Sequence, residues 1–202
     1  MSLRLDSDAR RTAFLEAARK LVTELGIEAL TMERLASASG VTKALPYRFF
    51  KNRDDVLVAL QIDDTARFDA RLADAMAGAV DFETRLRTLV ETWMKTLDSG
   101  DDAPALQHAR TANGALEAAR SARIIQAVKY IADLISEGRN IERKDALLAA
   151  SVLVAGSQGL AAIWRQTRRS RSALIDTFVK MAFGAVDAIE TKAQPVKRRR
   201  AG

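Results

Sequence analysis

The chain has 202 residues but no cysteine, and its only histidine is His108. Disulfide bonds and thiolate metal sites are therefore excluded, as is any multi-histidine metal centre. The sequence also offers no glycine-rich phosphate loop and no convincing serine, histidine and acid set. We therefore predict no catalytic residues, no metal, no cofactor and no enzyme activity, in a protein of the reducing cytoplasm.

Residues that interrupt helices are also scarce, with three prolines and ten glycines, and aromatic residues make up only 5%. The long stretches of good helix formers between them predict an all-α fold. No run of residues approaches the roughly 18 apolar residues that a membrane span needs, and the polar start, Met1 to Arg11, has no apolar signal core. We therefore expect a soluble protein with no membrane partner.

The formal net charge of +6 is concentrated at one end of the chain. Five of these charges come from basic residues after the last apolar segment: Lys192, Lys197, Arg198, Arg199 and Arg200. We predict that residues 192–202 form a disordered tail, which attracts phosphate without reading a base sequence. A prediction of specific DNA binding must therefore rest on a local pattern.

Apolar residues recur at helical spacing along most of the chain. We predict helices at about 8–25, 32–38, 43–50, 53–77, 82–97, 114–137, 143–166 and 172–190, with a short segment at 105–110. Thr31 and Asn52 are suited to cap the helices that follow them. Gly26, Gly40 and Gly138 are placed to end the helices that precede them.

The first three of these segments predict a helix-turn-helix preceded by a supporting helix. In such a unit the first two helices form a platform, and the third projects polar side chains into the major groove of DNA. Four side chains of the third segment are too polar for a core: Thr42, Lys43, Tyr47 and Arg48. Because many small helical bundles share this pattern, it is only moderately specific.

Residues 14–60 carry a more specific signal, in the segments GIEALT (26–31), LA (35–36), GVTK (40–43) and YRFFKNRDDVL (47–57). This stretch resembles the N-terminal DNA-binding domain of the TetR (tetracycline-repressor-like) family. The resemblance implies a helix-turn-helix domain over residues 1–52 and a larger helical domain for effector binding and dimerisation over residues 53–191, followed by the tail.

The resemblance also implies roles for individual residues. Thr31, Tyr47 and the basic Arg53 are expected to contact phosphate, and the opening of the recognition helix is expected to face bases or backbone, with Lys43 as the candidate reader of guanine. The expected DNA-binding set is Thr31, Thr42, Lys43, Ala44, Tyr47, Phe49, Lys51 and Arg53. The alternative is that Tyr47 lies at the edge of the core and that Lys51 and Arg53 are ordinary solvated charges.

Pro46 departs from the family pattern, in which leucine usually precedes the tyrosine. Proline has no N–H and disfavours an α conformation in the residue before it. The recognition helix is therefore expected to start late or to be distorted.

The last two predicted helices are apolar and rich in small residues, which suits a dimer interface formed by two helices from each subunit. The expected interface residues are Val152, Ala155, Gly159, Ala162, Phe178, Ala182 and Ala185. The alternative is that the two helices bury only each other within a monomer.

The resemblance further implies an effector pocket within the C-terminal helices. Candidates are large or polar residues on otherwise apolar helix faces: Phe68, Leu72, Trp93, Leu97, His108, Tyr130 and Gln158. This mixture predicts a largely apolar small molecule, although most of these side chains could equally be ordinary core residues. The expected function is that of a homodimeric transcriptional repressor, released from a palindromic DNA operator by the effector. The alternative is a DNA-architectural or helical adaptor protein without ligand control.

Overall fold

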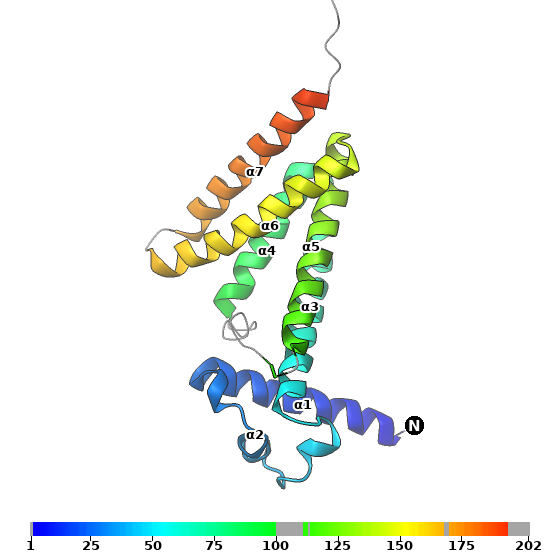
Figure 1. Cartoon of the computed structure of the whole chain (residues 1–202), viewed down its shortest axis with the longest axis vertical. Coiled ribbons are helices and arrows are strands. Elements are labelled where there is room, and N and C mark those ends of the chain that lie inside the picture. Colours follow the sequence, from blue (N-terminus) through cyan, green and yellow to red (C-terminus); the bar gives the residue numbers. More distant parts are fainter. Residues whose placement is uncertain (1, 100–110, 113, 168–169, 194–202) are drawn as a thin grey trace, which may run out of the picture. The chain divides into compact units, whose positions relative to one another are not determined.

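The computed structural model describes residues 2–99, 111–112, 114–167 and 170–193 (Figure 1). These ranges contain seven α-helices and two short 3₁₀ helices and no strand, which confirms the predicted all-α fold. The α-helices are α1 (Ser2–Leu25), α2 (Met32–Ala38), α3 (Arg53–Met76), α4 (Phe82–Ser99), α5 (Ala115–Arg139), α6 (Arg143–Gln166) and α7 (Arg171–Ala193), and the 3₁₀ helices are η1 (Ile27–Ala29) and η2 (Pro46–Arg48). The predicted short segment at 105–110 lies outside the described residues.

Local capping explains several helix boundaries. Gly26 ends α1 with a φ of 83°, a conformation that glycine adopts without strain. The Thr31 hydroxyl oxygen accepts a hydrogen bond from the Arg34 N–H (3.1 Å), and the Asn52 side chain accepts one from the Asp55 N–H (2.9 Å). The predicted caps of α2 and α3 are thus confirmed.

The prediction for the end of α5 was wrong. The helix continues through Gly138 to Arg139, and Asn140 follows with a φ of 50°. Gly138 instead permits a close approach, because a Cβ atom at this position would lie 2.8 Å from the Phe82 ring. The glycine is therefore needed for packing rather than for helix termination.

The chain forms two compact units. The first unit comprises residues 1–71 and 95–123, and the second comprises residues 72–94 and 124–202, so the chain passes between them within α3, α4 and α5. Most of α3, residues 53–71, therefore belongs to the same unit as α1 and α2. The division into functional domains at residue 52 remains a prediction.

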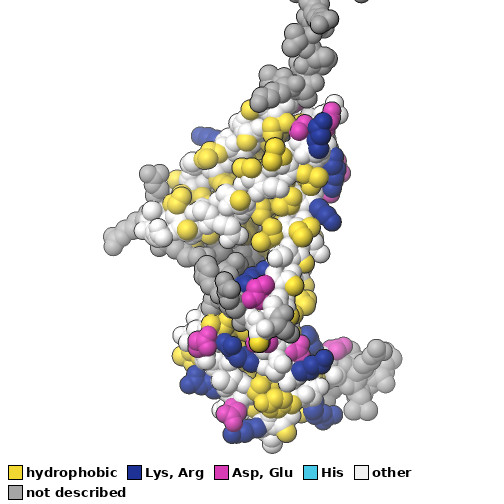
Figure 2. All heavy atoms as spheres, in the orientation of Figure 1, with side chains coloured by type: hydrophobic (Ala, Val, Ile, Leu, Met, Phe, Trp, Pro, Cys, Tyr) yellow, Lys and Arg dark blue, Asp and Glu magenta, His cyan; other side chains and the backbone are white. Residues whose placement is uncertain are grey.

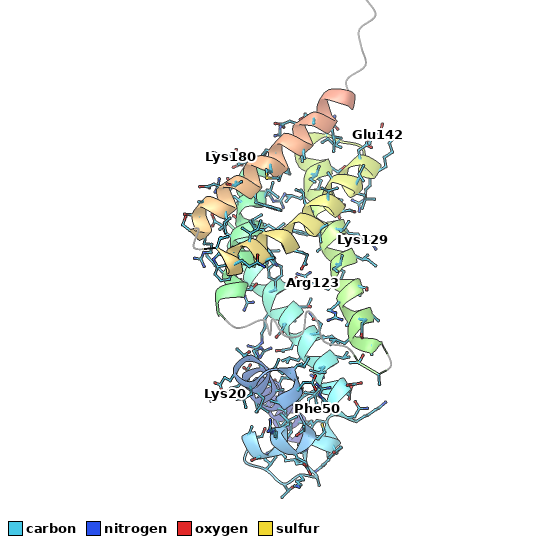
Figure 3. All side chains as sticks on the ribbon, turned by 60° about the vertical axis from the view of Figure 1, so that its left-hand side comes forward. Lys20, Phe50, Arg123, Lys129, Glu142 and Lys180 are labelled. Carbon is cyan, nitrogen blue, oxygen red and sulfur yellow. The ribbon has the colours of Figure 1, made fainter. Side chains whose placement is uncertain are left out.

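Aromatic side chains organise the core of the first unit. Phe14 of α1 and Phe50, which is labelled in Figure 3, are 1% and 2% exposed, and their rings meet edge to face with centroids 6.3 Å apart. Leu35 of α2 and Leu57 of α3 are fully buried in the same cluster. The three helices are thereby held around one aromatic centre.

A charged network also joins α1 to α3 inside the first unit. Arg19 and Asp64 are both buried, and the Arg19 Nε–H donates to the Asp64 carboxylate at 3.1 Å. Arg19 also bonds Asp63 (2.8 Å) and Glu16 (3.2 Å). Burial alone would lower the pKa of Arg19, but the hydrogen bonds with Asp64 and Asp63 outweigh it and leave the pKa raised. Arg19 is therefore charged at any physiological pH.

Small side chains lie among the larger apolar residues in the core of the second unit. Ala132, Ala146, Ala150 and Ala182 are fully buried among α5, α6 and α7, and this lets the helix axes approach closely. Helices α6 and α7 lie side by side (Figure 1). The unit thus has the small-residue packing expected from the sequence.

Helix α6 is more apolar than we expected. The segment Arg143–Trp164 is long and apolar enough to cross a membrane by composition alone, with a mean hydropathy of 1.8, which corrects the expectation that no segment approaches this limit. Only 33% of that window is buried in the chain. Such a helix is weak evidence for a membrane span, but its exposed apolar surface requires an explanation.

Candidate nucleic-acid interface

The recognition segment, residues 42–50, lies between α2 and α3. It is a turn followed by the 3₁₀ helix η2, not the predicted α-helix over 43–50. Most of its backbone bonds span three residues, such as those from the Leu45 N–H to the Thr42 carbonyl (3.0 Å) and from the Arg48 N–H to the Leu45 carbonyl (3.1 Å). In an α-helix the Thr42 carbonyl would accept from residue 46, but Pro46 has no N–H. The expected distortion is therefore present, and a bond of α-helical spacing, from the Phe50 N–H to the Pro46 carbonyl (3.0 Å), forms only at the end of the segment.

The segment is nevertheless well anchored, and it presents polar side chains to solvent. Pro46 and Phe50 are buried, whereas Thr42, Lys43 and Arg48 are exposed and Tyr47 is 55% exposed. Tyr47 is thus not a core-edge residue. The apolar positions hold the segment on α1 and α2, and the polar ones are available to a partner.

An ion pair holds Lys43, the predicted base reader. The Lys43 ammonium lies 2.8 Å from the carboxylate of Glu33, on the first turn of α2. The hydrogen bond with Lys43 lowers the pKa of Glu33, and the same bond raises the pKa of Lys43. Sequence reasoning missed Glu33, because nothing in a ten-residue separation across a turn indicates this contact.

Thr31 and Lys51 lie exposed at either end of this region. The Thr31 oxygen accepts the capping bond of α2, so its hydroxyl proton can still be donated to a phosphate oxygen. The Lys51 N–H donates to the Asp55 carboxylate (3.0 Å), while its ammonium group is exposed. Both residues can serve as phosphate contacts.

Arg53 has a structural task that was not predicted. Its guanidinium donates to the Leu30 carbonyl (2.9 Å) and to the Ile27 carbonyl (3.0 Å), and it lies 3.6 Å from the Glu28 carboxylate. It therefore ties the start of α3 to the turn before α2. A phosphate contact by Arg53 remains a prediction, but its removal would also disturb this turn.

Phe49, a member of the predicted DNA-binding set, also has a structural role that was not predicted. Its ring is half-buried and packs against Phe14, with centroids 5.3 Å apart, in the aromatic core. A contact between Phe49 and DNA remains a prediction. Phe49 is an anchor of the recognition segment.

Comparison with known proteins agrees with this arrangement. Residues 14–60 match the family model described as bacterial regulatory proteins, tetR family, and this range contains the platform, the turn and the start of α3. The chain belongs to the TetR family. It is accordingly a DNA-binding regulator of transcription.

Three relatives of this TetR-family chain extend over most of its length. It is 25% identical over 198 residues to the HTH-type transcriptional activator FasR of Mycolicibacterium smegmatis, covering 92% of this chain and 87% of FasR. The structure of the fatty acid degradation regulator FadR from Bacillus halodurans has a TM-score of 0.73 and 22% identity, covering 86% and 94% of the two chains. That of AibR, in complex with isovaleryl coenzyme A and operator DNA, has a TM-score of 0.65 and 20% identity, covering 85% and 97%.

The described effector candidates of this TetR-family chain differ in their exposure. Phe68 and Leu72 are buried and Trp93 is half-buried, whereas Tyr130 is 39% exposed and Gln158 is exposed. An effector-binding role for each of these residues remains a prediction. The side chain of Leu97 and all of His108 lie outside the described residues.

The predicted dimer residues divide into three groups by exposure. Val152 is 60% exposed, and Ala155, Gly159 and Ala185 are also exposed, while Ala162 and Phe178 are half-buried. Ala182 is fully buried in the core of its own chain, so it cannot contact a partner and is withdrawn from the set. The exposed members on α6 share one face of that helix, and Ala185 is the exposed member on α7.

Proposed function

We propose that this TetR-family chain is a homodimeric repressor that binds a palindromic operator and is released by a small, largely apolar effector. The observation that carries the proposal is the recognition segment, which exposes Lys43 and Tyr47 while its apolar residues anchor it to α1 and α2. We place the protein in the cytoplasm, where bacterial operator DNA lies.

The surfaces of α6 and α7 support the homodimer. Figure 2 shows hydrophobic side chains gathered over α5, α6 and α7. On α6 the exposed apolar or small residues recur at intervals of three or four, which is the spacing of one helix face, and α7 carries a shorter series. This apolar stripe consists of Leu148, Val152, Ala155, Gly159 and Ile163 on α6 and of Met181, Ala185 and Ala188 on α7. A second copy offers a matching stripe about a two-fold axis.

The dimer is tested by placing a charge within this apolar stripe. Val152→Glu should give a monomer in sedimentation velocity and lose operator binding, because a buried, unpaired carboxylate is strongly unfavourable. Val80→Glu is the matched control, since Val80 is 92% exposed and lies between α3 and α4. A Val152→Glu protein that remains a dimer would remove the stripe from the interface.

The path of α5 supports effector control. The start of α5 packs within the first unit, because Leu116 is fully buried in the core of that unit. Just before α5, the Ala112 N–H donates to the Asp54 carboxylate (2.9 Å). Arg123 pairs with Asp69 (3.2 Å), and α5 then continues into the second unit. A ligand that displaces α5 would therefore act on the platform of the recognition segment. By thermodynamic linkage, bound DNA must weaken the binding of this ligand by the same factor by which the ligand weakens the binding of DNA.

The names of two relatives indicate a class of effector. FadR is named for fatty acid degradation, and AibR was solved with isovaleryl coenzyme A. We therefore propose an acyl compound, such as an acyl coenzyme A, whose apolar chain agrees with the largely apolar effector expected from the sequence. Activation is the second candidate mode, because FasR is named an activator.

One experiment addresses the operator and the effector together. The protein is used to select bound sequences from random DNA, and the selected duplex is then titrated with acyl coenzyme A thioesters of increasing chain length. We expect one palindrome, bound at least about 10³-fold more tightly than random DNA and released by some of the thioesters. Binding that is indifferent to base sequence would contradict the proposal. Transcription in vitro from the operator then separates repression from activation.

The role of Tyr47 is tested by removing only its hydroxyl group. Tyr47→Phe should weaken operator binding by about 1 kcal/mol, roughly fivefold, because one hydrogen bond to phosphate is lost. The loss should be similar for all DNA sequences. Tyr130→Phe on α5 is the matched control and should leave DNA affinity unchanged. Equal affinity of Tyr47→Phe and the unmodified protein would remove Tyr47 from the interface.

A further inference from the structure

An acidic side chain lies within the surface that we propose meets DNA. Glu33 is 67% exposed, and its carboxylate pairs with Lys43, whose side chain is 76% exposed. A carboxylate that faces a polyanion weakens binding unless it has a partner there. Glu33 therefore lowers the affinity for DNA of any sequence, so it does not serve as a general contact to DNA.

The position of this pair is set by the backbone. The Val41 N–H donates to the Ala36 carbonyl (3.0 Å), and the Gly40 N–H donates to the Ser37 carbonyl (3.1 Å). These bonds join the end of α2 to the recognition segment, while Thr31 caps the start of α2 close to Glu33. The start of α2, which carries the carboxylate, and the recognition segment, which carries the ammonium group, thus bring the two groups side by side.

The two groups have complementary preferences for base edges in the major groove. A lysine ammonium donates to guanine O6 and N7, and a glutamate carboxylate accepts from the cytosine N4 amino group. A G·C pair, or neighbouring G and C bases, therefore satisfies both groups together. Against the phosphates of non-cognate DNA, Glu33 partly neutralises Lys43 and repels the backbone.

We propose that Glu33 is a specificity-determining residue: with Lys43 it reads guanine and cytosine, and it lowers affinity for all other DNA. This inference rests on the proposed function, because it requires the recognition segment to face DNA. Glu33 thus increases the discrimination between DNA sequences rather than the affinity for DNA.

The test compares two variants of equal charge in the full-length protein. Glu33→Gln removes the carboxylate from the pair, and Glu24→Gln removes the same charge from the exposed face of α1. Affinities for the selected operator and for a scrambled duplex are measured at one salt concentration, and the preferred sequence of each variant is selected again from random DNA. Thermal unfolding of each variant checks that the fold is intact.

We expect Glu33→Gln to bind the scrambled duplex more tightly and to lower the ratio of specific to non-specific affinity by about 5-fold to 150-fold, the usual range for one base contact. The sequences that it selects should lose a conserved G or C at the contacted positions. Glu24→Gln should raise both affinities by similar factors and keep the ratio and the selected sequence.

Two outcomes would overturn the inference, and they can be told apart. If Glu33→Gln behaves like Glu24→Gln while the unmodified protein keeps its operator preference, Glu33 is only a solvated charge and the proposed function stands. If the unmodified protein itself shows no base preference, both this inference and the proposed function fail.

Discussion

The two helical units of this chain differ in what they bury and in what they leave exposed. The first unit packs large aromatic side chains, such as Phe14 and Phe50, and leaves polar groups of its recognition segment exposed. The second packs alanines, such as Ala150 and Ala182, among larger apolar residues and leaves apolar side chains of α6 and α7 exposed. The first surface is therefore suited to a charged, hydrated partner, and the second to another apolar surface.

Charged groups show the same contrast. In the first unit the ion pair of Arg19 with Asp64 is buried between α1 and α3. In the second unit the pair of Arg87 with Asp176 joins α4 to α7, but its side chains are 35% and 50% exposed. Removing one partner should therefore have very different effects in the two units, and this difference is the most direct test of the comparison.

The largest effect is expected from Asp64→Asn. It leaves the buried Arg19 charge without its main partner, which typically costs 3–5 kcal/mol, and we expect about 3 kcal/mol because Asp63 and Glu16 still accept from Arg19. Asp176→Asn in the second unit should cost about 1 kcal/mol or less. Urea unfolding of the two variants measures both values. Equal destabilisation would show that burial does not distinguish the two pairs.

A smaller effect is expected where α5 meets α4 in the second unit. Gly138→Ala places a methyl group against the Phe82 ring, and overpacking of this kind costs about 1–3 kcal/mol. Gly78→Ala, after the end of α3, adds the same methyl group in open space and should be nearly neutral. Melting temperatures of the two variants compare these sites. A stabilising Gly138→Ala would show that Phe82 can move aside.

Pro46→Leu should change DNA recognition more than stability. Leucine restores an N–H that can donate to the Thr42 carbonyl, which adds about 1 kcal/mol, while the loss of proline stiffness removes a similar amount. We expect a longer helix in the recognition segment and a different selected operator. Circular dichroism and repeated selection from random DNA check these two expectations. An unchanged operator would mean that bound DNA already imposes the helical form.

Much of the fold could be predicted because the signals are local. The bounds of α2 and α6 agree with the predictions, since apolar spacing and nearby capping residues set them. Gly138 was misread as a helix end because its true neighbour, Phe82, is distant in sequence. Ala182 was assigned to the wrong face because small residues occur on both faces of α7, and only packing shows which face is buried.

Only part of the candidate site could be predicted, because only some of its features depend on residues that are close in sequence. The polar residues of the recognition segment and the effect of Pro46 follow from short-range rules. The bonds from Arg53 to Ile27 and Leu30, and the pair of Glu33 with Lys43, depend on how the chain turns between helices. These contacts decide which cations are available to DNA, and apolar periodicity contains no information about them.

The smallest effect is expected at Asp81, which caps α4. Its carboxylate accepts from the Thr84 N–H (2.8 Å) and the Thr84 hydroxyl (2.7 Å), and these bonds lower the pKa of Asp81 below its ordinary value of 3.8. A lowered folded-state pKa means that this stabilisation is fully present above pH 3.8 and is lost as the pH falls through the folded-state value. Asp81→Asn should therefore reduce the dependence of stability on pH below about pH 4, and Asp74→Asn on α3 is the control. Unfolding curves between pH 3 and pH 6 measure the difference, and parallel profiles for Asp81→Asn and the unmodified protein would show that this cap contributes nothing to acid sensitivity.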